Sequence, residues 1–237
     1  MDHKLETLYS LGGGLRNTGP RELVNAHFNG ESLERLLIGP GALPDSVVSM
    51  RNCSFSKCSI KEVFLIHGGV ILDNVVFDSL RFPDMATISA QTVFNRVVFK
   101  GKMKGSGLWV KPLQFADPAM RPIYDQWASD AWSSIDWMLD ISELETKEVE
   151  IVGLPASKLR WNPERHVVVK REWVSSDAWK ELNFPFSSFW RQRVKRLDAF
   201  NVTEGLYSLP LPEEKIYLQA KEDMSRLIEC GLLAMND

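Results

Sequence analysis

Apolar side chains recur along the first half of the chain at a fixed distance of 22 residues. Phe55, Phe77 and Phe99 stand in the segments RNCSF, DNVVF and NRVVF, and one further step back reaches Leu33. A repeat of this length is typical of a solenoid, whose successive coils stack and share one core. The same shift of 22 residues relates a second set of apolar positions: Phe28, Met50, Leu72 and Phe94.

Within each repeat the apolar positions advance in steps of five residues, followed by one step of seven. The positions two residues earlier carry mostly small or aliphatic side chains, and residues two apart in a strand point to the same face. The pattern therefore predicts a coil with four short sides per turn, which is a square parallel β-helix. The side chains expected to point inward are Phe28, Leu33, Ile38, Leu43, Met50, Phe55, Ile60, Leu65, Leu72, Phe77, Phe82, Thr87, Phe94 and Phe99.

Two five-residue units in this region resemble the repeats of pentapeptide-repeat proteins. The segments CSFSK (53–57) and CSIKE (58–62) each place a small residue and a large apolar residue where that family fills its interior. The resemblance covers about residues 26–100 and implies a right-handed β-helix, although the seven-residue step departs from the family's steady turn. Cys53 and Cys58 are expected to be small structural side chains of the core.

The rhythm of the repeat fades at both ends. Lys102 and Lys104 fall on steps that a dry core would not accept. We therefore expect three parts: an N-terminal cap over 1–25, the β-helix over 26–109 and an α/β domain over 110–237. Four aliphatic side chains of the coils are expected to point outward and to be covered by the second half of the chain. They are Ile71, Val76, Val93 and Val98.

The second half of the chain holds all eight tryptophans and predicts both helices and strands. A helix is expected to start at Pro118, with apolar residues at helical spacing from Ile123 to Leu139. Further elements are a half-exposed strand at 149–152, a strand at 166–170, a short helix at 177–182, and a terminal helix from Pro212 with Gly231 as its cap. The whole chain is therefore expected to be α+β, a short β-helix followed by an α/β cap domain.

Composition agrees with a globular protein, since 44% of the 237 residues are hydrophobic and 25% are charged. A net charge of -3 gives no strong field, so neither nucleic-acid binding nor membrane binding is expected. Three cysteines do not suggest a disulfide framework, and no run of 18 apolar residues suggests a membrane span. These features predict a cytoplasmic protein.

Catalytic patterns are scarce in this sequence. The four histidines have no metal-ligand spacing, and neither a GxSxG elbow nor a Walker phosphate loop is present. We therefore expect no metal, no cofactor and no enzymatic activity. Two alternatives stay open. One is a small carbohydrate-active enzyme or ligand-binding protein that would use Asp73 and Asp78 on a coil face, and the other is a DNA-mimicking pentapeptide-repeat protein.

Two C-terminal segments carry a second resemblance. NPERHVVVKREW (162–173) and LIECGLLA (227–234) are similar to the tails of bacterial immunity proteins that accompany secreted polymorphic toxins. The resemblance implies a non-enzymatic protein that binds and neutralises one toxin domain. The partner expected on this basis is a protein.

Two sets of residues are alternative candidates for contacting such a toxin. A cationic set with tryptophan anchors would face an acidic toxin, whereas an acidic set would plug a basic nucleic-acid-binding cleft, because complementary charge speeds association. The cationic set comprises Arg191, Arg193, Lys195 and Arg196, with Trp161 and Trp190 as anchors. The acidic set comprises Glu143, Glu145, Glu148 and Glu150.

Overall fold

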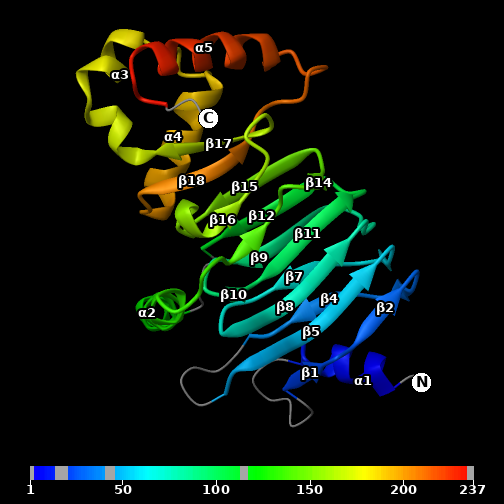
Figure 1. Ribbon diagram of the computed structural model, residues 1–237. Coiled ribbons are helices and arrows are strands. Elements are labelled where there is room, and N and C mark those ends of the chain that lie inside the picture. The colour runs from blue at the N-terminus through cyan, green and yellow to red at the C-terminus, as the bar shows by residue number, and fades with distance from the viewer. Residues whose placement is uncertain (1–2, 14–20, 41–45, 113–116, 234–237) are drawn as a thin grey trace.

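The computed structural model describes residues 3–13, 21–40, 46–112 and 117–233. The fold is α+β, as expected, and most of its strands pair in parallel. Figure 1 shows successive passes of the chain stacked one upon the next from the N-terminal to the C-terminal end. Helices lie at both ends of the stack, and one helix lies at its side.

The largest sheet of the described residues follows one side of the stack. Its members are β1 (Glu22–Val24), β2 (His27–Asn29), β5 (Val48–Ser56), β8 (Val70–Asp78), β10 (Val93–Asn95), β11 (Val97–Lys102), β13 (Leu139–Asp140), β14 (Leu144–Glu145) and β16 (Leu159–Arg160). Phe77 pairs in parallel with Phe55 on one side and with Phe99 on the other. The predicted 22-residue repeat is therefore confirmed for these passes.

A second sheet follows another side of the stack and changes direction at its C-terminal end. Its members are β4 (Leu36–Ile38), β7 (Phe64–Ile66), β9 (Met85–Ser89), β12 (Gly107–Lys111), β15 (Glu148–Val152), β18 (Glu204–Ser208) and β17 (His166–Lys170), in this spatial order. Pairing is parallel up to β15 and antiparallel in the β15–β18–β17 part. A short pair, β3 (Ser32–Leu33) with β6 (Ser59–Ile60), lies apart from both sheets.

In four successive passes, two corner residues adopt the left-handed backbone conformation at aligned positions. All eight corner residues have φ between 51° and 68°, and the two corners of one pass are five residues apart. Asparagine and glycine tolerate this conformation better than other residues do. The first corner comprises Asn25, Asn52, Asn74 and Arg96, and the second comprises Gly30, Lys57, Ser79 and Gly101.

Aromatic rings form a column inside the stack. Ring centroids are 4.7 Å apart between Phe28 and Phe55, 5.4 Å between Phe55 and Phe77, and 4.5 Å between Phe77 and Phe99. All four rings are fully buried. Each layer removes the ring of its neighbour from water, so the stack gains stability with every added pass.

Phe28 and Leu33 are buried as predicted, but the predicted 22-residue spacing is wrong for the first pass. Leu33 pairs with Ile60 and Phe28 pairs with Phe55, so the first pass is displaced by 27 residues, not by 22. The physical reason is the link between passes, which takes ten residues from Ile38 to Val48 but only four from Ile66 to Val70. The predicted inward orientation is wrong for Leu65 and Thr87, which are only half-buried, because their neighbours Phe64, Ile66, Ala86 and Ile88 fill the interior. Leu43 lies outside the described residues.

Parallel pairing continues past the boundary expected at residue 109. β12 pairs with β15, and β11 pairs with β13, so two layers of one stack are separated by an inserted segment. That segment holds α2 (Met120–Trp132), which contacts β10 and lies at the side of the stack (Figure 1). Val93 of β10 is buried where α2 contacts this strand, as predicted, whereas Ile71, Val76 and Val98 are only half-buried.

The remaining helices flank the two ends of the stack. α1 (His3–Ser10) covers the first layer and buries Leu8, but the cap predicted over 1–25 is shorter than expected, because β1 (Glu22–Val24) already pairs within the first sheet. At the other end lie α3 (Asp177–Leu182), α4 (Phe189–Phe200) and α5 (Tyr217–Glu229). α3 has its predicted bounds, whereas α5 starts five residues after the predicted Pro212. Helix α2 ends at Trp132, before the predicted Leu139, because Leu139 enters the sheet as the first residue of β13.

Candidate functional site

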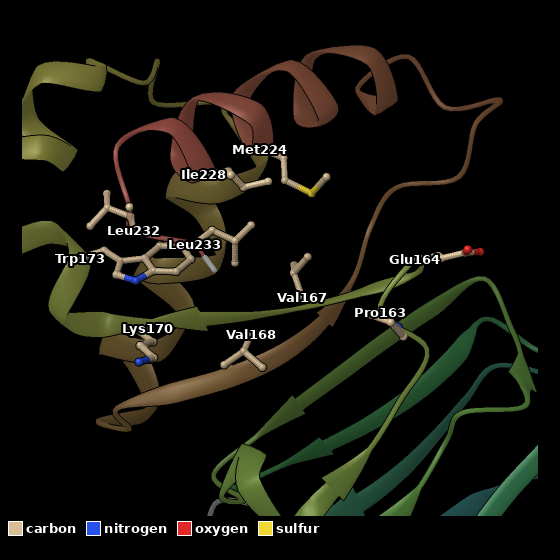
Figure 2. Close-up of a pocket in the computed structure, with 11 residues that line it drawn as sticks. Pro163, Glu164, Val167, Val168, Lys170, Trp173, Met224, Ile228, Leu232 and Leu233 are labelled. Atoms are coloured by element: carbon tan, nitrogen blue, oxygen red, sulfur yellow. The ribbon is translucent and has the colours of Figure 1, made fainter. Parts of the chain in front are cut away.

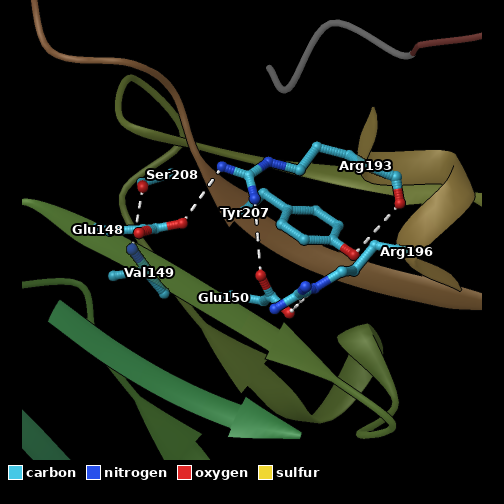
Figure 3. Close-up of polar contacts among 7 residues, drawn as sticks. All are labelled: Glu148, Val149, Glu150, Arg193, Arg196, Tyr207 and Ser208. Atoms are coloured by element: carbon cyan, nitrogen blue, oxygen red, sulfur yellow. Dashed lines mark hydrogen bonds and ion pairs between the residues drawn. The ribbon is translucent and has the colours of Figure 1, made fainter. Parts of the chain in front are cut away.

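Two members of the cationic set bind two members of the acidic set. Helix α4 lies over the outer face of β15 and β18, and Figure 3 shows Arg193 and Arg196 reaching from it to Glu148 and Glu150. Arg196 Nε donates to Glu150 Oε1 at 2.8 Å, and Arg193 Nη1 lies 3.5 Å from Glu150 Oε2. Arg193 Nη2 lies 3.3 Å from Glu148 Oε1. Glu150 is buried and therefore cannot contact a toxin, whereas Glu148, Arg193 and Arg196 are partly exposed, and their role as contact residues stays a prediction.

The burial of Glu150 has a simple cause. The sequence predicts a half-exposed strand at 149–152, but β15 is an inner strand between β12 and β18, and α4 covers its outer face. The Glu150 side chain is only 1% exposed, and a buried carboxylate needs paired cations. Tyr207 lies in the same layer, where burial and the nearby Glu150 carboxylate raise the pKa of its hydroxyl.

The two predicted tryptophan anchors are also held within the fold. Trp190 belongs to α4 and is fully buried. Its Nε1 donates to the carbonyl of Ala220 in α5 at 3.0 Å. Trp161 is half-buried and packs against the core of the stack. Trp190 is therefore wrong as an anchor. The other two acidic residues, Glu143 and Glu145, are exposed at the end of the first sheet, away from Glu148 and Glu150 in the pairing order.

Two members of the cationic set remain on the surface, and they flank an exposed aromatic ring. Arg191 and Lys195 are exposed on α4, with their charged groups 5.2 Å and 5.0 Å from the centroid of the Phe186 ring. Phe186 itself is 62% exposed. We call Phe186, Arg191 and Lys195, with the neighbouring Val174 and Trp179, the α3–α4 surface. These side chains line a shallow hollow of about 490 Å³.

Local capping interactions position the α3–α4 surface. Asn183, in the left-handed conformation, ends α3, and the Ser188 hydroxyl starts α4 by accepting from the Arg191 backbone N–H at 3.1 Å. The turn between them carries Phe186, and Gln192 Nε2 donates to the Phe186 carbonyl at 2.7 Å. The Arg191 side chain donates to the Phe184 carbonyl at 3.1 Å. The turn is therefore held in place by side chains of α4.

The charges around the α3–α4 surface are unbalanced. Lys180 is paired with Asp177, and the Asp198 carboxylate lies 4.0 Å from Arg171. Within the described part of the chain, neither Arg191 nor Lys195 has a carboxylate within ion-pair distance. Two positive charges therefore stand beside the ring without a carboxylate in ion-pair contact, although Asp198 lines the same hollow. Sequence reasoning found these two cations but missed Phe186, for which only the short segment FPF (184–186) gives a signal.

The remaining candidate groups for chemistry are structural in character. Cys53 and Cys58 are buried free thiols, and burial raises the pKa of both, which keeps them protonated. His166 is buried in β17, and its burial lowers the pKa to about 4. Over residues 3–13, 21–40, 46–112 and 117–233, no three His, Cys, Asp or Glu side chains come together as a possible metal site.

Comparison with known proteins finds no matching family model, no matching curated protein and no matching solved structure. In the part of the chain that the structure describes, no helix combines the length and apolar character needed to cross a membrane.

Proposed function

We propose that the protein is a non-enzymatic, cytoplasmic binding protein that contacts an acidic face of a partner protein through the α3–α4 surface. The single observation that carries this proposal is the exposed Phe186 ring between the unpaired charges of Arg191 and Lys195. We further propose that the partner is a bacterial toxin domain and that this protein is its immunity protein, as the resemblance of the C-terminal segments implies.

The physical chemistry of the surface suits protein recognition. An aromatic ring exposed at 62% has much apolar area to remove from water, and aromatic and arginine side chains dominate the binding energy of many interfaces. The flanking cations would steer an acidic partner and then pair with its carboxylates. Because side chains of α4 already hold the turn, little conformational entropy would be lost on binding.

We also propose that the stack is a four-sided parallel β-helix of the pentapeptide-repeat type. The aligned left-handed corners, five residues apart in four successive passes, support this assignment, as does the column of phenylalanine rings. A solenoid of this kind is a rigid support. In this proposal it carries the C-terminal helices and their binding surface at one end (Figure 1).

The two other functions have less support from the contacts of the relevant carboxylates. Asp73 accepts from Asn95 Nδ2 at 2.7 Å and Asp78 accepts from the Ser79 hydroxyl at 2.7 Å, so both carboxylates of the coil face are engaged in the fold. A DNA mimic needs a continuous row of exposed acidic groups. Here the acidic set is divided between buried and exposed positions, which favours the cationic surface.

The experiment is an affinity capture from the source cell with two charge-reversal variants. The α3–α4 variant carries Arg191→Glu and Lys195→Glu, and the matched control carries Lys102→Glu and Lys104→Glu, two exposed cations of the stack. We expect the wild type and the control to retain one common protein partner that the α3–α4 variant loses. Equal recovery of that partner by all three proteins would contradict the proposed surface.

A further inference from the structure

A separate groove lies along the free edge of the second sheet. β17 is the last strand of this sheet and, among the described residues, pairs with β18 alone. A cavity of about 480 Å³ runs beside it, and Figure 2 shows Met224 and Ile228 of α5 on its far side, with Leu233 between the helix and the strand. The wall of the groove that α5 forms, opposite β17, is therefore apolar.

The cavity lies against the edge of β17 and not against one of its faces. Val167 and Val168 both line it, although consecutive side chains of a strand point to opposite faces. Val167 is buried in the core below α4 and α5, and Val168 is half-buried on the other face. A space that touches both side chains must pass along the backbone between them.

The hydrogen-bond pattern of the β17–β18 pair turns the backbone of Val168 toward this groove. Leu209 N–H donates to the Arg165 carbonyl at 2.8 Å, and Arg171 N–H donates to the Thr203 carbonyl at 2.8 Å. In an antiparallel pair, residues alternate between facing the partner strand and facing away. Residues 165, 167, 169 and 171 therefore face β18, and the N–H and C=O of Val168 face the groove.

We propose that this groove binds an extended peptide segment of a partner protein as an added β-strand. The backbone groups of Val168, which have no partner among the described residues, would form the ladder hydrogen bonds, which is the usual basis of strand addition. Helix α5 lies beyond the edge of β17 (Figure 1), so the opening suits a single extended segment and not the edge of a second folded sheet.

The side chains around the groove define the chemistry of that segment. An apolar residue of the peptide would contact Met224 and Ile228. Glu164 and Lys170 lie at opposite ends of the groove (Figure 2), so charge complementarity selects a basic residue at the Glu164 end. At the other end, an acidic residue of the peptide would compete with Glu172, which pairs with Lys170 at 3.8 Å in an exposed contact. This site shares no residue with the α3–α4 surface and stands independently of it.

The test uses a library of displayed random nonapeptides selected on the full chain, followed by calorimetry with the selected peptides. Val168→Pro removes the N–H that faces the groove without removing a ladder hydrogen bond, and proline is accepted at such edge positions. Val168→Thr keeps the N–H and is the matched control. We expect apolar peptides with a basic residue at one end that bind the wild type and the control alike, and bind Val168→Pro at least about tenfold more weakly.

A second readout makes the result independent of how well Val168→Pro folds. Bound peptide should slow the hydrogen exchange of the Val168 amide in the wild-type protein. Arg191→Glu with Lys195→Glu should bind the peptides as the wild type does, which separates this proposal from the proposed function. Failure to select any peptide, equal binding to a folded Val168→Pro variant, or unchanged exchange at Val168 would overturn it.

Discussion

Glu150 and Arg196 form an ion pair that fixes helix α4 on the outer face of the second sheet. Arg196 Nε donates to Glu150 Oε1 at 2.8 Å, and the Glu150 side chain is almost completely buried. Arg193 stands one helical turn before Arg196 and contacts the same carboxylate, whereas Arg191 and Lys195 are exposed. One basic segment therefore has two roles, because helical spacing divides its cations between the sheet and the solvent.

Removal of the buried carboxylate should destabilise the protein. Glu150→Ala removes the carboxylate that Arg193 and Arg196 share, but both guanidinium groups are partly exposed and Arg193 keeps Glu148, so the expected loss is about 1–3 kcal/mol. Urea unfolding followed by circular dichroism measures the loss. The control is Glu145→Ala, an exposed residue, for which we expect a change below about 0.5 kcal/mol. Similar small losses for both variants would contradict the described pairing.

The interior register of the second pass can be tested with neighbouring residues. Phe64 is 2% exposed and contacts the phenylalanine column, whereas Leu65 is half-buried on the opposite face. Phe64→Ala should cost about 3–5 kcal/mol through the cavity that it leaves. Leu65→Ala should cost clearly less in the same unfolding measurement. A larger loss of stability in Leu65→Ala than in Phe64→Ala would support the register predicted from the sequence, in which Leu65 points inward.

The left-handed corners offer a stabilising substitution. Lys57 has φ of 53°, although lysine gains no local hydrogen bond there as asparagine does. Lys57→Asn should therefore raise the free energy of unfolding by up to about 1 kcal/mol. Asparagine already adopts the same left-handed conformation at the first corner of three passes. Lys61→Asn, at an exposed position without positive φ, is the control. A loss of stability in Lys57→Asn would argue against the described corner.

Buried His166 predicts a loss of stability in mild acid. The folded protein holds the pKa of His166 at about 4, below the ordinary value of 6.5, because burial disfavours the charged imidazolium. The unfolded chain therefore takes up this proton first as the pH falls. The contribution to stability is complete above pH 6.5, declines between about 6.5 and 4, and amounts to about 3 kcal/mol in total.

The measurement compares the wild type with His166→Gln by urea unfolding at several pH values from 7 to 4. Acidification should shift the stability difference between the two proteins by up to about 3 kcal/mol in favour of the variant. His67, whose pKa is also lowered by burial, is present in both proteins and cancels. A pH-independent difference would mean that His166 is accessible to protons in the folded state.

The repeat could be predicted because each layer of a stack must match its neighbours. Phe55, Phe77 and Phe99 pair at the predicted distance, since a ring displaced by one residue would leave the column. The first pass could not be placed in the same way, because the link from Ile38 to Val48 carries no periodic signal that reports its length. The α2 insertion hid the later layers for the same reason.

The candidate site was only partly predictable. Charge density along the sequence identified the right helix, but which cations pair internally depends on how α4 lies over β15, and no local pattern contains that information. Trp190 and Phe186 show the same limit. These two aromatic residues are four positions apart, yet Trp190 is fully buried and Phe186 is 62% exposed. The difference arises because Ser188, between them, starts helix α4.

The most direct test of the proposed function is a calorimetric titration of the captured and purified partner protein. We expect a 1:1 complex with the wild type that weakens as the salt concentration rises, because exposed charge pairs are screened. Arg191→Glu with Lys195→Glu, and separately Phe186→Ala, should each weaken binding by at least about tenfold. Unchanged affinity in both variants would contradict the assignment of the α3–α4 surface as the binding site.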